Sequence, residues 1–246
     1  MTNKYQYFVA NWKMYGDLKA LNSLDKVIKF SKSIKHKKLK LIYCPPSTLI
    51  NSLFNKLKNS KIEVGAQNSH ESDHYGAFTG QINSKMLKNV GARYVILGHS
   101  ESRQTGEDNK KINSKIKSAL KSGLKIIYCI GETLNEKRNK KTNQVLSKQI
   151  NMGLKSIRNK SNIIIAYEPV WSIGTGLIPK PSDLIKSISF IKKKLGKKPS
   201  KILYGGSVNS DNIKQLKNIN TIDGFLIGGA SQDPKKFIDI IKKTIN

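Results

Sequence analysis

The 246-residue sequence is poor in cysteine and lacks long apolar runs. Its two cysteines, Cys44 and Cys129, are far apart, lack metal-ligand spacing and each lie at the end of an apolar run, which favours two buried free thiols in a reducing compartment over a disulfide. No segment approaches the ~18 consecutive apolar residues of a membrane-spanning helix, and no apolar stretch follows a basic start. The sequence therefore predicts a soluble, cytoplasmic protein without a targeting signal.

Acidic residues and arginine are also scarce. Against 16 Asp and Glu stand 45 Lys and Arg, for a net charge of +29, which raises the question of nucleic-acid binding. Only four of the basic residues are arginine. Proteins that recognise a nucleic-acid sequence favour arginine, because its planar guanidinium group can form two hydrogen bonds to one base or phosphate. The lysines are spread over nearly every amphipathic segment, so we interpret them as a solvated surface that attracts small anions, with no specific nucleic-acid partner.

No linker or change of composition divides the chain, which predicts a single domain over residues 1–246. Short apolar runs alternate with longer amphipathic segments, as in repeated βα units. Eight runs are rich in Ile, Val and Tyr with little polar alternation, as expected for parallel strands covered on both faces. These predicted strands span residues 7–11, 39–44, 62–66, 94–97, 125–130, 163–167, 202–204 and 224–227.

Eight βα units in one domain favour an α/β fold of the closed (β/α)8 barrel type. An open, doubly wound sheet is the alternative, but it needs a Gly-x-Gly-x-x-Gly turn after the first strand, and none is present. Two helices have visible start signals. One has Ser182 as a predicted cap and carries its apolar face on Leu184, Ile185, Ile188, Ile191 and Leu195, and the last has Asp233 as a cap and Pro234 at its first position.

Polar residues and glycines directly follow several predicted strands. In a βα barrel these positions form one active face. Each has an ordinary explanation by itself: a surface lysine, a structural histidine, an ion-pair partner or a turn. Their common position at the same end of every unit predicts that they converge. They are Asn11 and Lys13, His99 and Glu101, Glu168, the 205–207 Gly-Gly-Ser run, and Gly228 and Gly229.

A carboxylate such as Glu168 in an apolar cleft is a suitable base for removing a proton from a carbon beside a carbonyl. The developing oxyanion needs donors already in place, which Asn11, Lys13 and His99 can supply. The residues after His99 start a predicted short helix, and a helix N-terminus disfavours a charged imidazole. We therefore expect a neutral His99 that donates one hydrogen bond.

The glycines after the last two strands predict a phosphate site formed by backbone NH groups. A nucleotide-type Gly-x-x-x-x-Gly-Lys loop is absent. Residues 169–176 join a stiff proline and apolar side chains, including a Trp and an Ile that we expect to be exposed, to flexible glycines. This pattern predicts a lid that excludes water during the reaction.

Nine segments, in order, resemble the triosephosphate isomerase family over essentially the whole chain. They are Asn-Trp-Lys at 11–13, Gly-Ala-Gln-Asn at 65–68, Gly-Ala-Phe-Thr-Gly at 76–80, Gly-His-Ser-Glu at 98–101, Cys-Ile-Gly-Glu-Thr-Leu at 129–134, Tyr-Glu-Pro-Val-Trp at 167–171, Ile-Gly-Thr-Gly at 173–176, Tyr-Gly-Gly-Ser-Val at 204–208 and Gly-Gly-Ala-Ser at 228–231. The resemblance implies interconversion of dihydroxyacetone phosphate and D-glyceraldehyde 3-phosphate through an enediolate, in glycolysis and gluconeogenesis, without cofactor or metal.

The resemblance also implies individual roles. A glutamate base beside a neutral histidine is the family's well-known pairing; here Glu168 would carry the proton and His99 would polarise the carbonyl. Lys13 would stabilise anionic charge and Asn11 would orient the substrate. Glu101 would support the region of Asn11 and Lys13. The implied phosphate ligands are Gly174, Ser207, Gly228 and Gly229.

The resemblance implies a homodimer in which the loop from Gly76 to Gly80 reaches the partner through Thr79. The family commonly has Glu at the position of Gln81 and Arg at that of Ser102, so one intersubunit ion pair is expected to be missing as a unit, which costs less than one unpaired charge. The far hinge of the lid reads Leu-Ile-Pro at 177–179, where Lys-Thr-Ala is frequent in the family. Because the proline fixes one backbone angle, we expect the rates of lid opening and closing to differ from those of the family.

Two other functions stay open at this stage. Another sugar-phosphate barrel, an aldolase or lyase, would need a Schiff-base lysine inside the barrel, and Lys40 and Lys125 lie at the starts of their strands, the wrong end. If the chain were a nucleic-acid-binding protein on an inactive enzyme scaffold, we would expect the catalytic and phosphate-binding residues after the strands to be replaced. All five groups of these residues are intact.

Overall fold

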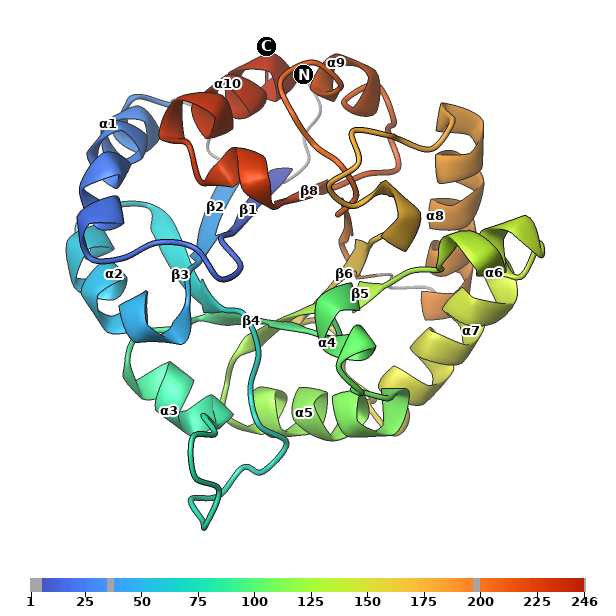
Figure 1. Ribbon diagram of the computed structural model, residues 1–246, viewed down its shortest axis with the longest axis horizontal. Coiled ribbons are helices and arrows are strands. Elements are labelled where there is room, and N and C mark those ends of the chain that lie inside the picture. The colour runs from blue at the N-terminus through green and yellow to red at the C-terminus, as the bar shows by residue number, and fades with distance from the viewer. Residues whose placement is uncertain (1–5, 35–37, 197–199, 246) are drawn as a thin grey trace.

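The computed structural model describes residues 6–34, 38–196 and 200–245. Eight parallel strands close into a barrel in sequence order, and helices surround it (Figure 1). The strands are β1 (Gln6–Asn11), β2 (Leu39–Cys44), β3 (Ile62–Ala66), β4 (Tyr94–Leu97), β5 (Lys125–Ile130), β6 (Ile163–Tyr167), β7 (Ile202–Tyr204) and β8 (Gly224–Ile227). The predicted (β/α)8 barrel is confirmed.

The strand bounds match the sequence prediction except at the first strand. That strand begins at Gln6, one residue early, because Gln6 pairs with Leu39 and its amide donates to the carbonyl of Lys38 at 3.0 Å. The barrel closes where β1 pairs with β8, with Tyr7 opposite Gly224. A Cβ on Gly224 would lie 2.0 Å from the Tyr7 carbonyl oxygen, so only glycine fits at this seam.

Apolar side chains form two cores, one inside the barrel and one between the barrel and its helices. The strands contribute to both, because successive residues point to opposite faces. Cys44 and Cys129 both belong to the inner core and are buried and free, as predicted. Burial raises the pKa of both thiols well above the ordinary range.

The helices and 3-10 turns lie between the strands and after the last one. They are η1 (Lys19–Leu24), α1 (Asp25–Ser33), η2 (Ser47–Leu49), α2 (Ile50–Leu57), α3 (Ser84–Asn89), α4 (Ser100–Gln104), α5 (Asn109–Lys121), α6 (Leu134–Arg138), α7 (Thr142–Gly153), η3 (Val170–Ser172), α8 (Pro181–Leu195), α9 (Ile213–Leu216), η4 (Gly229–Ser231) and α10 (Pro234–Ile245). Among the residues described, no helix combines the length and apolar character that crossing a membrane requires.

One of the two predicted helix starts is correct. In α10, Pro234 is the first residue and Oδ1 of Asp233 accepts a hydrogen bond from the amide of Lys235 at 2.7 Å. The prediction of Ser182 as a cap is wrong, because α8 already starts at Pro181, whose fixed φ suits the first helical position. Ile185 lies at the edge of the apolar face, 41% exposed.

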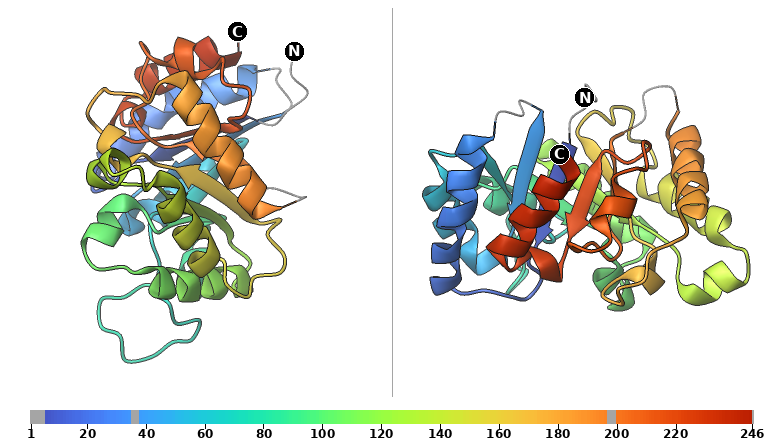
Figure 2. Two further views of the ribbon diagram at one scale, coloured as in Figure 1. Left: turned by 90° about the vertical axis from the view of Figure 1, so that its right-hand side faces the viewer. Right: turned by 90° about the horizontal axis from the view of Figure 1, so that it is seen from above.

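The segment between β3 and α3 projects from the barrel as a long loop, at the bottom of Figure 1 and of the left view in Figure 2. At its base the amide of His70 donates to the carbonyl of Ile82 at 2.8 Å, and the rings of His70 and Phe78 are 4.4 Å apart. The Asn83 side chain closes the base, since its Nδ2 donates to the carbonyl of His74 at 3.1 Å and its Oδ1 caps α3. These contacts hold the loop away from the rest of the chain.

Candidate active site

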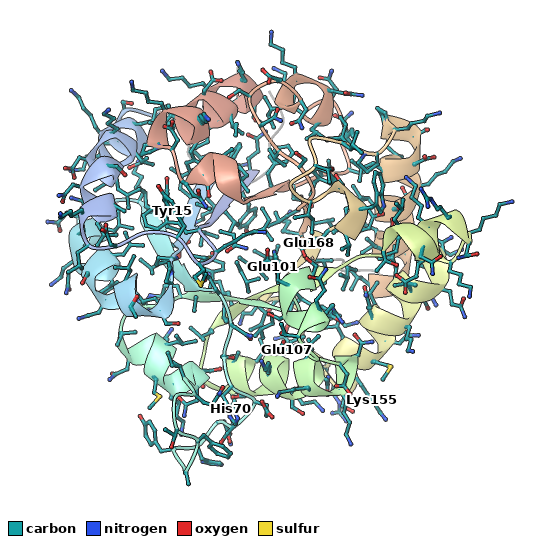
Figure 3. The ribbon with its side chains drawn as sticks, in the orientation of Figure 1. Tyr15, His70, Glu101, Glu107, Lys155 and Glu168 are labelled. Carbon is teal, nitrogen blue, oxygen red and sulfur yellow. The ribbon has the colours of Figure 1, made fainter. Side chains whose placement is uncertain are left out.

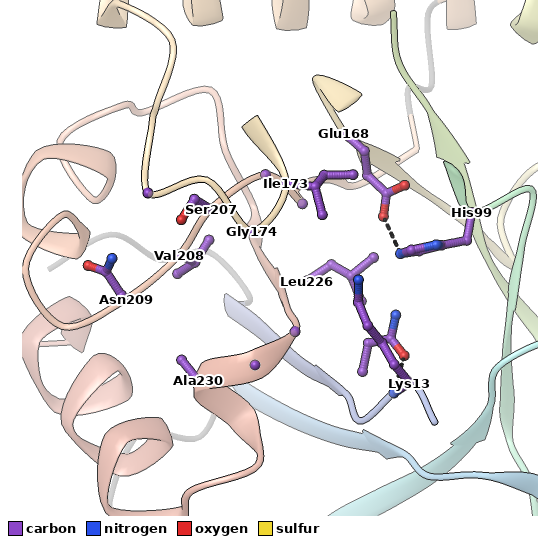
Figure 4. A pocket seen from close by; sticks show the side chains of 16 residues that line it. Lys13, His99, Glu168, Ile173, Gly174, Ser207, Val208, Asn209, Leu226 and Ala230 are labelled. Atoms are coloured by element: carbon purple, nitrogen blue, oxygen red, sulfur yellow. Dashed lines mark hydrogen bonds and ion pairs between the residues drawn. The ribbon is translucent and has the colours of Figure 1, made fainter. Parts of the chain in front are cut away.

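The residues predicted to act together surround one cavity at the C-terminal ends of the strands (Figure 4). Its volume is about 290 Å³. It is lined by all eight predicted catalytic and substrate-binding residues: Asn11, Lys13, His99, Glu168, Gly174, Ser207, Gly228 and Gly229. Five of the eight strand ends therefore contribute to a single site, as parallel barrel geometry requires.

Glu168 follows β6 directly and is only 2% exposed. Its amide donates to the carbonyl of Ile130 at 2.8 Å, which fixes the backbone, and its Oε2 accepts a weak hydrogen bond from the amide of Ser100 at 3.4 Å. The other oxygen, Oε1, is buried without a hydrogen-bond partner in the described part of the chain. Oε1 lies 3.5 Å from Nε2 of His99, so a buried carboxylate oxygen is available at the cavity.

Two glycines make room for this glutamate. A Cβ on Gly205 would lie 2.8 Å from Cγ of Glu168, and a Cβ on Gly131 would lie 1.8 Å from its carbonyl oxygen. Both contacts are shorter than non-bonded carbon atoms allow, so a side chain at either position would displace Glu168. The sequence analysis assigned Gly205 to phosphate binding alone and missed its contact with the carboxylate side chain.

His99 is the residue before α4, and its ring caps that helix. The amide of Glu101 donates to Nδ1 of His99 at 3.2 Å. A ring nitrogen that accepts a hydrogen bond carries no proton, so in the neutral ring the proton is on Nε2, the atom that faces Glu168. This geometry agrees with the predicted neutral His99 that donates a single hydrogen bond.

Lys13 has a left-handed backbone, with φ of 56°. Strain of this kind costs roughly 1–3 kcal/mol and must be held by the surroundings. Here the Lys13 amide donates to Oδ1 of Asn11 at 3.1 Å, and Nε2 of Gln67 donates to the Lys13 carbonyl at 2.7 Å. Its Nζ contacts Oε1 of Glu101 at 2.5 Å. Sequence reasoning missed Gln67, because its partners lie 54 and 23 residues away.

The glycine-rich end of the cavity is formed by the segments after β7 and β8. A Cβ on Gly206 would lie 2.3 Å from the Tyr204 hydroxyl and 2.7 Å from Oγ of Ser172, so glycine is required there. A Cβ on Gly229 would contact nothing within 4 Å, which leaves its backbone open to the cavity. This open backbone can approach an anion closely.

The predicted lid leaves the barrel at its near hinge through Ser172, which is fully buried. Its Oγ donates to the carbonyl of Leu177 at 2.6 Å and lies 2.9 Å from the Tyr204 hydroxyl, and the amide of Ser207 donates to it at 3.3 Å. One hydroxyl thus ties the lid, β7 and the glycine-rich end together. The sequence analysis did not single out Ser172 or Tyr204.

Trp171 is half-buried, so the expectation of an exposed Trp in the lid is wrong, and Ile173 is likewise half-buried. Nε1 of Trp171 donates to Oε1 of Glu132 at 3.0 Å, and Nζ of Lys137 lies 3.5 Å from the centre of the Trp171 ring. Glu132 is buried and also accepts a hydrogen bond from the Tyr167 hydroxyl. The exposed part of the lid is limited to residues 174–177.

Two predicted supporting residues do not line the cavity. Glu101 lies beside it and contacts both Lys13 and His99, and Figure 3 shows Glu101 and Glu168 near the barrel centre. Thr79 is exposed on the projecting loop, and the structure does not bring it to the site of its own chain. Within the described ranges, no group of three or more His, Cys, Asp or Glu side chains could hold a metal ion.

A buried polar cluster, also missed from the sequence, lies behind α4. Lys115 is 4% exposed and pairs with Glu107, and both bind the side chain of Asn68. Asn68 in turn approaches Ser102 at 3.5 Å. Gln81 is exposed on the projecting loop, and both Gln81 and Ser102 are uncharged. Neither departure from the family pattern therefore leaves a buried unpaired charge.

Known proteins resemble this chain over nearly its whole length. The family model described as triosephosphate isomerase matches residues 6–244. Curated triosephosphate isomerases from Zygosaccharomyces bailii and Thermodesulfovibrio yellowstonii are each 41% identical to the chain, covering 96% of it and 97% and 98% of their own lengths. A crystal structure of triosephosphate isomerase from Bartonella henselae superposes with a TM-score of 0.89 at 34% identity, covering 98% of this chain and 99% of the other. The chain belongs to the triosephosphate isomerase family.

Proposed function

We propose that the chain interconverts dihydroxyacetone phosphate and D-glyceraldehyde 3-phosphate, the triose phosphates of glycolysis and gluconeogenesis, with Glu168 as the base. The observation that supports this most is the buried Oε1 of Glu168, which has no hydrogen-bond partner among the described residues and faces Nε2 of His99 at 3.5 Å. A base in this position can reach a substrate carbon bound in the cavity beside it, with the imidazole close to the carbonyl oxygen.

The reaction is a proton transfer with no net oxidation. Glu168 removes a proton from the carbon beside the ketone, and the electron pair moves onto the carbonyl oxygen to form an enediolate. The Nε2 proton of His99, the Lys13 ammonium and the Asn11 amide stabilise that oxygen. Glu168 then returns the proton to the neighbouring carbon, while protons redistribute between the two oxygens through His99, which gives the aldehyde.

The phosphate group binds at the glycine-rich end, at Gly174, Ser207, Gly228 and Gly229. Support comes from the open backbone at Gly229 and from the lid, whose Gly174 lines the same cavity. Closing residues 174–177 over the phosphate would exclude water and protect the enediolate from losing its phosphate. The reaction proceeds without a cofactor or a metal ion in this proposal.

The test is a coupled assay of triose phosphate interconversion with wild type and Glu168→Gln. The variant keeps the shape of the side chain but lacks the base, so kcat should fall by a factor of about 10²–10⁴ or more with KM little changed. Solvent deuterium should enter the substrate carbon with wild type. Unchanged activity in the variant, or a product free of deuterium, would refute the mechanism.

An aldolase or lyase would form a Schiff base on a lysine. Among the described residues that line the cavity, Lys13 is the only lysine, and its Nζ contacts Glu101. A cation paired in this way is a poor nucleophile. Borohydride trapping of substrate on Lys13 would favour this alternative, and its absence would favour the isomerase. A nucleic-acid role would instead appear as tight duplex binding that survives physiological salt.

We also propose a cytoplasmic homodimer in which each chain is one domain. Exposed apolar side chains on the projecting loop and on the segment after β1 support an interface: Met14 is 99% exposed, Tyr75 69%, Tyr15 51% and Phe78 49%. Exposed apolar groups of this size mark association surfaces. Thr79 on the same loop would then reach the partner's site, and the two free thiols suit a reducing compartment.

A further inference from the structure

A second cavity, of about 400 Å³, lies at the opposite end of the barrel from the proposed active site. It is formed at the starts of the strands, where βα barrels carry no catalytic loops. Its lining includes three lysines and two tyrosines, Lys125, Lys160, Lys201, Tyr7 and Tyr94, together with Ser200. Its volume falls within the range of small-molecule pockets, roughly 300–1,000 Å³.

The charge around this cavity is positive. None of its described lining residues is acidic. Lys125 and Lys160 form no ion pair within the described ranges, whereas Nζ of Lys201 lies 3.6 Å from Oδ1 of Asp223. The other nearby acid, Glu63, accepts a hydrogen bond from the Tyr94 hydroxyl and lies 4.0 Å from Lys40. Two ammonium groups at the cavity, those of Lys125 and Lys160, therefore have no counter-charge among the described residues.

The positive charge around this cavity also lowers the pKa of a neighbouring lysine, Lys88. The pKa of Lys88 is lowered, first by burial and then by repulsion from Arg93 and Lys125. Lys125 is exposed, and its Nζ lies over the Tyr94 ring, 5.2 Å from its centre, a cation–π contact that favours this position beside the cavity.

Ser200 supplies an unused hydrogen-bonding group. The residue is 8% exposed and its Oγ is buried without a hydrogen-bond partner among the described residues. Buried hydroxyls are normally satisfied, so such an exception calls for an explanation. An acceptor oxygen bound in the cavity that Ser200 lines would satisfy it.

We propose that this cavity is a second anion site, which binds a small phosphorylated molecule carrying at least two negative charges. Lys125 and Lys160 neutralise the phosphate oxygens, Lys201 shares its charge between the ligand and Asp223, and Ser200 donates one hydrogen bond. Charge-assisted hydrogen bonds to phosphate are the strong ones, and ammonium groups serve as point charges for this purpose. The site is separate from the barrel face that carries Glu168 and does not depend on the proposed reaction.

The experiment is calorimetric titration of the full chain with inorganic pyrophosphate. The Lys125→Gln/Lys160→Gln double variant is compared with Lys26→Gln/Lys29→Gln, which removes the same charge from exposed positions on α1. We expect the first double variant to weaken pyrophosphate binding at this site by about tenfold or more, and the second to change it by less than about twofold. Equal weakening in both would show a diffuse surface field and overturn the proposal.

Ser200→Ala provides an independent check. Because its hydroxyl has no partner in the described chain, removing it should leave the melting temperature without pyrophosphate unchanged or slightly raised. It should reduce the rise in melting temperature that pyrophosphate causes, since at a given concentration a ligand that binds more weakly stabilises the fold less. A wild-type titration that shows binding only at a site unaffected by all of these variants would refute the second anion site.

Discussion

Oε1 of Glu168 lies 3.5 Å from Nε2 of His99, at the centre of the cavity where five strand ends meet. This distance depends on two neighbouring groups that take no part in the proposed proton transfer. The amide of Glu101 fixes the ring of His99, and the missing side chain of Gly205 leaves room for the glutamate.

Gly205→Ala should therefore lower kcat while leaving KM nearly unchanged. The new Cβ would lie 2.8 Å from Cγ of Glu168 and push the carboxylate away from the reacting carbon. A misplacement of about 1 Å can cost ~10²-fold in rate. Steady-state kinetics in both reaction directions would measure the change.

Gly229→Ala is the matched variant. Its Cβ meets nothing within 4 Å in the chain, so the fold should tolerate it, but it occupies space beside the proposed phosphate. We expect KM to rise with a smaller effect on kcat. Identical kinetic profiles for the two variants would contradict the division of the cavity into a proton-transfer end and a phosphate end.

Ser172→Ala should destabilise the fold and loosen the lid together. The change leaves the buried Tyr204 hydroxyl without its partner, and an unsatisfied buried group costs about 1–3 kcal/mol. It also removes the hydrogen bond that holds the Leu177 carbonyl in the exposed part of the lid. A loss of this size lowers the melting temperature by several degrees in a chain of this length, at about 2–4 °C per kcal/mol. KM should rise as the lid loses its anchor.

Tyr204→Phe is the control, because it keeps the bond from Ser172 to Leu177. It should lower the melting temperature less than Ser172→Ala and leave KM unchanged. If Tyr204→Phe raised KM as much as Ser172→Ala, the lid would depend on the packing against β7 and not on the serine.

Glu132 should make stability depend on pH. Burial raises the pKa of this carboxyl, while hydrogen bonds from Trp171, the backbone and Tyr167 lower it, with a net upward shift. A folded-state pKa above the unfolded value of about 4.3 means that the folded chain binds the proton more tightly. This contribution to stability is fully present below the unfolded pKa and is lost as the pH rises through the folded pKa.

Glu132→Gln removes that titration and keeps an acceptor for Trp171. The variant should gain stability relative to wild type as the pH rises from about 4 to 7. Melting curves of both proteins across this range would measure the difference. A constant difference would mean that folding leaves the pKa of Glu132 unchanged, and one that shrinks as the pH rises would mean that folding lowers this pKa.

The dimer proposed above should tighten when the two missing charges are restored together. Gln81→Glu alone or Ser102→Arg alone adds an unpaired charge at the interface, and each should raise the dimer dissociation constant. The double variant should bind about tenfold more tightly than either single variant, because close interfacial pairs couple favourably. Sedimentation at decreasing concentration measures this, and a wild-type dimer that never dissociates on dilution would count against a weakened interface.

Much of the fold was predictable because its signals are local. The apolar runs predict all strand bounds except the start of β1, which begins one residue earlier, at Gln6. They do so because a buried parallel strand is itself a short apolar run. The convergence of Lys13, His99 and Glu168 was also predictable, because parallel barrel strands all end at the same face.

The features that sequence reasoning missed depend on partners that are distant along the chain. Trp171 is half-buried because Glu132, 39 residues earlier, accepts its indole proton. Gln67 supports Lys13 across 54 residues, and Ser172 meets Tyr204 across 32. Apolar periodicity contains no information on such pairs. The wrong cap at Ser182 has a local cause, since Pro181 starts the helix one residue earlier.

The seam between β1 and β8 has a consequence for how the chain is made. The partner of Tyr7 is Gly224, so β1, which leaves the ribosome before the other seven strands of the barrel, has to wait for β8, the last of them. Until then the growing sheet has two open edges, at β1 and at the newest strand, and open edges pair readily with other chains. Aggregation of nascent chains should therefore be greatest just before residue 224 emerges and should stop once the ring closes.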